Sequence, residues 1–131
     1  MTKTRQPSRA ARSGDSQALP TTGQQDVAPE VIKDIRNHGL IGDRSKLATA
    51  ITADITRRIE VGIQRYGHPL QTHNGRDALV DAYEESEDLL NYLCQRCMEQ
   101  PGNAKVRILY WNAIAMVFGL AELLGRDQAE S

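Results

Sequence analysis

The sequence predicts an all-α protein, a helical bundle of about four helices with a disordered N-terminal tail. Apolar residues recur at three- and four-residue steps, and no stretch shows the period-two alternation of a strand. Pro, Gly and Asn residues divide the chain into segments of helix length, and no internal repeat is visible. With 131 residues and a hydrophobic content of 40%, the chain suits a single domain, which we assign to residues 29–131.

Residues 1–28 differ in composition from the rest of the chain. They are rich in Ser, Thr, Gln, Arg and Pro and contain scarcely any large apolar side chains. Such a segment buries too little surface to offset the entropy lost on ordering. We therefore expect residues 1–28 to form a disordered, solubilising tail.

The first two helices follow from their end signals. Pro29 suits a first helical position and Gly39 suits a C-terminal cap, which predicts a short helix over 29–39. The next segment, residues 43–66, has Leu and Ile residues at helical spacing before Gly67, so we expect an amphipathic helix of about six turns.

Two further helices are predicted after the break at Pro69. Asn74, followed three residues later by Asp77, resembles a helix N-cap with its reciprocal acidic partner, and the third helix should run from there to about residue 100. Pro101 and Gly102 interrupt the chain again. A fourth helix is expected over about 104–124, with Asn103 as a possible cap and Gly125 closing it.

The predicted fourth helix is apolar nearly all round. Between Ile108 and Ala121 only Asn112 is strongly polar, so the helix needs cover on most of its sides. The apolar run falls short of the roughly 18 to 20 residues that span a membrane, and we interpret it as a buried helix. A second copy of the chain would supply the cover, so we expect a homo-oligomer through residues 104–124 and no membrane association.

Charge and cysteine content restrict the class of protein. The net charge is −1, which argues against a dedicated nucleic-acid surface. The two cysteines, Cys94 and Cys97, have Cys-x-x-Cys spacing without a second pair, and we interpret them as core thiols. No apolar secretory segment opens the chain, so we expect a reducing cytoplasmic location.

The most unusual stretch is residues 77–88, which contain six carboxylates and no Lys or Arg. A charged helix face opposite an apolar face is typical of any surface helix and is the simpler interpretation. However, like charges three or four residues apart cost a few tenths of a kcal/mol per pair, and basic residues usually intervene. Glu85 and Asp88, on adjacent turns, can present oxygens to one Mg²⁺ ion, so a metal site is the alternative.

Residues before this helix suggest a ligand for such a metal. Arg76 lies where backbone amides at a helix N-terminus favour anions, and its guanidinium can bind a phosphate through two hydrogen bonds, although a salt bridge to the nearby acids is the commoner role. Tyr66 can stack on a base or simply pack the helix end. Asn74, without reference to the other candidate residues, is explained as a helix N-cap.

The stretch "RYGHPLQTHNGRDALVDAYEESEDLLNYL", residues 65–93, resembles phage-encoded proteins similar to the MazG-like, all-α nucleoside triphosphate pyrophosphohydrolases. The resemblance implies that Glu85 and Asp88 are a Glu-x-x-Asp pair that holds Mg²⁺. It implies that Asp81 and Glu84 are auxiliary ligands or position water. The family's second acidic cluster, Glu-Glu-x-x-Glu on the preceding helix, is absent from this chain.

In that helix only Asp54 and Glu60 stand in place of the cluster. Our leading interpretation is a Mg²⁺-dependent nucleoside triphosphate pyrophosphohydrolase in which Glu60 or Glu84 accepts the proton of the attacking water. The nucleotide-binding candidates are Tyr66, Asn74 and Arg76. The alternatives are a catalytically inactive protein that binds or sequesters a nucleotide, and a helical oligomeric interaction module.

Overall fold

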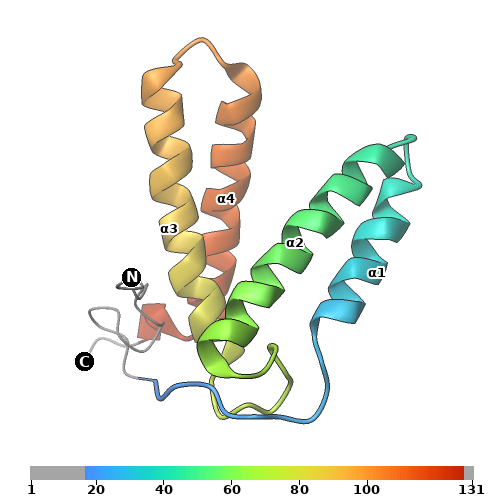
Figure 1. Ribbon diagram of the computed structural model, residues 1–131. Coiled ribbons are helices and arrows are strands. Elements are labelled where there is room, and N and C mark those ends of the chain that lie inside the picture. Colours follow the sequence, from blue (N-terminus) through green and yellow to red (C-terminus); the bar gives the residue numbers. More distant parts are fainter. Residues whose placement is uncertain (1–16, 129–131) are drawn as a thin grey trace, which may run out of the picture. The chain divides into compact units, whose positions relative to one another are not determined.

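The computed structural model describes residues 17–128, and over these residues the fold is all-α (Figure 1). The elements are α1 (Ala28–Gly39), α2 (Ser45–Tyr66), α3 (Ala78–Glu99), α4 (Ala104–Leu123) and the short 3₁₀ helix η2 (Arg126–Gln128). Between residues 17 and 128 no strand forms beyond one antiparallel bridge. The predicted fold class is confirmed.

The chain divides into two compact units, one ending at Arg76 and the other beginning at Asp77. Each unit is built on a helical hairpin, because α1 packs on α2 and α3 packs on α4. The single helical domain over residues 29–131 stays a prediction. The first sixteen residues of the expected tail lie outside the described residues.

In the first hairpin, the two helices approach closely at Gly39. This glycine is the last residue of α1, and the C-cap is Leu40 in a right-handed conformation. A Cβ added at Gly39 would lie 2.5 Å from the Cβ of Ala48, a buried residue of α2. The prediction that Gly39 caps the helix was therefore wrong, because the glycine is needed for helix contact.

The end of α2 is as predicted. Gly67 has a φ of 82°, and its N–H donates to the carbonyl of Ile63 at 2.7 Å. This left-handed conformation is readily available to glycine and satisfies a carbonyl at the helix end. The helix therefore stops where Gly67 lies.

Residues 21–27, which we expected in a disordered tail, lie instead along the loop that follows α2. Backbone hydrogen bonds join Thr21 to Asn74, Gln24 to Thr72 and Val27 to Leu70, at 2.9, 2.9 and 3.1 Å. Backbone pairing of this kind needs no large apolar side chains, which is why a composition argument missed it.

The second hairpin begins at Asp77, which is the N-cap of α3. Its side chain accepts hydrogen bonds from the backbone N–H groups of Leu79 and Val80 at 2.9 and 3.4 Å. The prediction that Asn74 is this cap was wrong by three residues. Asn103, by contrast, caps α4 as predicted and accepts from the N–H of Val106 at 3.2 Å.

Only one residue of α4 is buried, namely Ala113. Our interpretation of this helix as a buried one is therefore wrong within a single chain. Among the described helices, α4 alone is long and apolar enough to cross a membrane by length and composition, a test that core helices of soluble proteins also pass. The helix extends over 20 residues, beyond the apolar run that we consider too short for a membrane span.

Candidate functional site

The acidic stretch of α3 separates into residues with different roles. Asp77 stabilises the first turn as the N-cap, so one of the six carboxylates has a structural purpose. Asp81 also lies in the first turn, where a negative charge is favourable next to the helix N-terminus. The function of the remaining acids depends on which side of α3 they occupy.

Ser86 is the buried residue of α3. It is 5% exposed, and its hydroxyl donates to the carbonyl of Tyr83 at 2.7 Å. At 100° per residue, four carboxylates occupy an arc of about 100° on the opposite side of the helix. They are Asp81, Glu84, Glu85 and Asp88, and we call them the acidic face.

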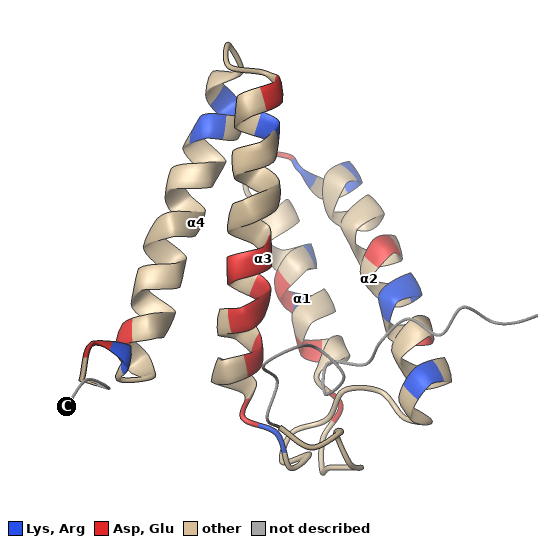
Figure 2. Ribbon diagram, turned by 90° about the vertical axis from the view of Figure 1, so that its left-hand side faces the viewer, with Lys and Arg blue, Asp and Glu red and all other residues tan. Residues whose placement is uncertain are grey.

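The acidic face is concentrated in the N-terminal half of α3 (Figure 2). Its four residues are half-buried, whereas Glu87, on the flank of the helix, is exposed. No Lys or Arg lies on α3 before Arg96. Partial burial fits a surface face as well as a metal site, so the metal site stays a prediction.

The acidic face has the donor chemistry that Mg²⁺ requires. Mg²⁺ binds carboxylate oxygens and usually takes one or two protein carboxylates, with waters and substrate phosphates completing the octahedron. Glu85 and Asp88 lie three residues apart and meet this requirement. Among residues 17–128 no three Asp, Glu, His or Cys side chains gather closely enough to form a complete protein cage.

The loop before α3 places Asn74 and Arg76 in structural roles. Asn74 is 7% exposed, its Oδ1 accepts from the N–H of Arg76 at 3.1 Å, and its carbonyl accepts from Thr21. The Arg76 guanidinium donates to the carbonyls of Ala18 and Gln17 at 2.5 and 3.5 Å. Both residues thus hold the N-terminal segment against the loop, and their contact with a nucleotide stays a prediction.

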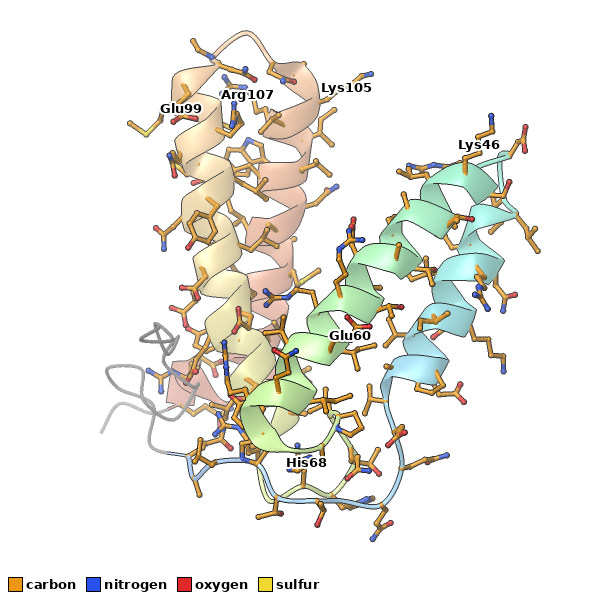
Figure 3. The ribbon with its side chains drawn as sticks, in the orientation of Figure 1. Lys46, Glu60, His68, Glu99, Lys105 and Arg107 are labelled. Atoms are coloured by element: carbon orange, nitrogen blue, oxygen red, sulfur yellow. The ribbon has the colours of Figure 1, made fainter. Side chains whose placement is uncertain are left out.

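The candidate residues of the first unit do not form a carboxylate cluster on α2. Asp54 makes an exposed ion pair with Arg57 on the next turn. Glu60 is exposed on α2 (Figure 3), and Tyr66 is half-buried at the helix end, with the guanidinium of Arg65 5.9 Å from its ring centroid. Asp54 is thus already paired with a cation of its own helix.

One interaction of the second hairpin was missed by the sequence analysis. Cys94 and Cys97 on α3 are half-buried free thiols, and Tyr110 of α4 hydrogen-bonds to Cys94. This hydrogen bond, together with the charge that Cys94 acquires on ionisation, raises the pKa of Tyr110. No motif in either helix signals the contact, because it depends on how α3 and α4 pair.

The described surface has two shallow hollows that lie away from the acidic face. One, of about 440 Å³, follows the C-terminal half of α3 beside Asn91, Cys94 and Met98. The other, of about 230 Å³, lies between α1 and α2 beside His38 and Leu47. Neither contains a carboxylate of the acidic face.

Comparison of the chain with protein-family models, curated proteins and solved structures found no match.

Proposed function

We propose that this protein binds a nucleoside triphosphate through Mg²⁺ at the acidic face of α3 and hydrolyses it to a nucleoside monophosphate and pyrophosphate. The observation that carries the proposal is the acidic face itself. It groups four half-buried carboxylates on one side of a helix, without an intervening basic residue. The resemblance of residues 65–93 to the MazG-like pyrophosphohydrolases supports the same chemistry.

The proposal gives each residue a role. Glu85 and Asp88 would hold Mg²⁺, and Asp81 would help to position water. The bound ion would offset phosphate charge and lower the pKa of a coordinated water. Glu84 would accept the proton of the water that attacks the α-phosphorus. Glu60, which lies in the first unit, stays an alternative base suggested by the sequence alone. The bond from that phosphorus to the bridging oxygen would break, and pyrophosphate would leave. Contact of the same nucleotide with Tyr66, Asn74 and Arg76 of the first unit stays a prediction from the sequence.

A second function, nucleotide binding without hydrolysis, is favoured by the carboxylates of α2. The MazG-like family uses an acidic cluster on this helix, whereas here Asp54 is paired with Arg57 and Glu60 is exposed. The absence of the family's acidic cluster would weaken water activation more than phosphate binding, because the metal pair Glu85 and Asp88 on α3 would remain. The chain would then sequester a nucleotide.

The test is a thermal-shift screen of the purified protein with nucleoside triphosphates and monophosphates, with and without Mg²⁺, followed by an assay for pyrophosphate. A ligand at one hundred times its dissociation constant should stabilise the protein by about 2.7 kcal/mol. Mg²⁺-dependent stabilisation with pyrophosphate release would support the hydrolase. Stabilisation with the nucleotide recovered intact would support the binder, and no shift with any nucleotide would reject both.

The residue assignment is tested by a matched pair of variants. Glu85→Ala should abolish both the Mg²⁺-dependent shift and pyrophosphate release, because one of the two metal carboxylates is lost. Glu87→Ala removes a carboxylate two residues away that is exposed and lies outside the acidic face, and it should retain both signals. Equal behaviour of the two variants would reject the acidic face as the metal site.

A further inference from the structure

The outer side of α4 carries the largest group of exposed apolar residues in the second unit. Six of its large residues have exposed fractions between 55% and 73%, and no charge interrupts the helix between Arg107 and Glu122 (Figure 2). They are Ile108, Leu109, Trp111, Met116, Phe118 and Leu123, and we call them the α4 apolar face.

The size of this face indicates that it is covered in solution. With about 200 Å² for a large apolar residue, the exposed fractions of the six residues amount to roughly 750 Å². The largest apolar patch of a typical monomer is about 300 to 600 Å², and a stable interface buries about 800 Å² on each partner. One partner surface of similar size would therefore account for the α4 apolar face.

A lipid bilayer is a poor match for this partner. α3 packs on α4, and the opposite side of α3 carries the four carboxylates of the acidic face. A hairpin in lipid would bring these carboxylates to membrane depth, at roughly 2.5 to 3.5 kcal/mol for each charged residue near the bilayer centre. A protein partner requires no such burial of charge.

The charges of α4 point to a second copy as the partner. Lys105 and Arg107 lie at its N-terminal end, beside the turn from α3 (Figure 3), and Glu122 lies at its C-terminal end. If two antiparallel copies cross near Ala115, Glu122 of one copy lies beside Ile108 of the other. Lys105 of that other copy is then about one helical turn from Glu122. Such a pairing brings opposite charges together at both ends and is symmetric, as expected for a homodimer.

Two residues at the centre of this crossing are small. Ala115 and Gly119 lie one turn apart on the exposed side of α4, and a Cβ added at Gly119 would meet no atom within 4 Å. Small side chains let two helix backbones approach closely, while Trp111 and Phe118 flank the contact. We propose that this protein forms a homodimer in which the α4 apolar face packs antiparallel against the same face of a second copy.

The first test is the mass of the full-length protein by light scattering at micromolar concentration. The dimer should have twice the 14.5 kDa mass of the chain. Phe118→Glu places a charge inside the interface of both copies and should weaken the dimer by about 100-fold or more. Leu40→Glu, at a residue that is 76% exposed in the turn between α1 and α2, should leave the mass unchanged.

The second test is disulfide cross-linking, which stays informative if Phe118→Glu does not fold. In a Cys94→Ser, Cys97→Ser background, Ala115→Cys should form a covalent dimer under mild oxidation. Lys105→Cys should not, because antiparallel copies would hold the two residues about 30 Å apart, far beyond disulfide reach. A monomer, cross-linking through residue 105 alone, or association only with phosphatidylglycerol-containing vesicles would each overturn the proposal.

Discussion

Gly39→Ala should destabilise the protein, although alanine normally stabilises a helix. The added Cβ would lie 2.5 Å from the Cβ of Ala48 and 3.2 Å from the carbonyl oxygen of Arg44. Neither atom can rotate away, because one is a Cβ and the other is backbone. Overpacking of this kind costs about 1 to 3 kcal/mol, and the helix gains about 0.5 to 1 kcal/mol from replacing glycine. We expect a net loss of roughly 1 to 2 kcal/mol.

Gly62→Ala is the matched control for this prediction. Gly62 lies inside α2, and a Cβ added there would meet no atom within 4 Å. Only the helix preference remains, so this variant should gain about 0.5 to 1 kcal/mol. Thermal unfolding followed by circular dichroism at 222 nm distinguishes the two, since 1 kcal/mol corresponds to roughly 4 °C or more in a domain of this size.

A double-mutant cycle tests the physical cause. In an Ala48→Gly background the atom that collides with the new Cβ is absent, so Gly39→Ala should lose most of its cost. If Gly39→Ala raises the melting temperature as Gly62→Ala does, α1 and α2 do not approach at Gly39 and the reasoning fails.

Two further predictions concern the second hairpin. Asp77→Ala should lower the free energy of unfolding by about 1 kcal/mol because the N-cap of α3 is lost. Asp77→Ser should keep most of the stability that the cap contributes, because serine also caps helices. Equal unfolding curves for both variants would contradict the capping role of Asp77. The pKa of Tyr110 is raised by its hydrogen bond to Cys94, so its phenolate should form at higher pH than in an unfolded chain, and stability should fall as the pH rises above about 10. The difference in absorbance at 295 nm between wild type and Tyr110→Phe isolates this titration, and Cys94→Ala should lower the pKa.

Several elements of the fold were predictable because their signals are local. Gly67 ends α2 in a left-handed conformation, and Asn103 caps α4 through its own side chain. The start of α3 was misjudged because Asn74 and Asp77 are both good caps, and the choice depends on the loop. Asn74 is buried and binds Thr21 and Arg76, so it is not available to the helix.

The acidic face was recognised from spacing alone, since helical periodicity places Asp81, Glu84, Glu85 and Asp88 on one side. The packing role of Ser86, in the middle of the same stretch, was not recognised. A serine in a charged run looks like part of a solvated face, and only its 5% exposure shows that this side of α3 is covered there. The structural use of Arg76 was missed for the same reason, because its partners are carbonyls more than fifty residues away.

Local sequence patterns were enough to predict the helical class, the approximate length of each helix and the grouping of carboxylates on one side of α3. These features depend on residues within a few positions of one another, where periodicity and capping chemistry act. Three other features emerge only in the folded chain: Gly39 lies at the close contact of two helices, residues 21–27 pair with the loop after α2, and the outer side of α4 is exposed. These features depend on contacts between distant segments, and no local pattern encodes which segments meet.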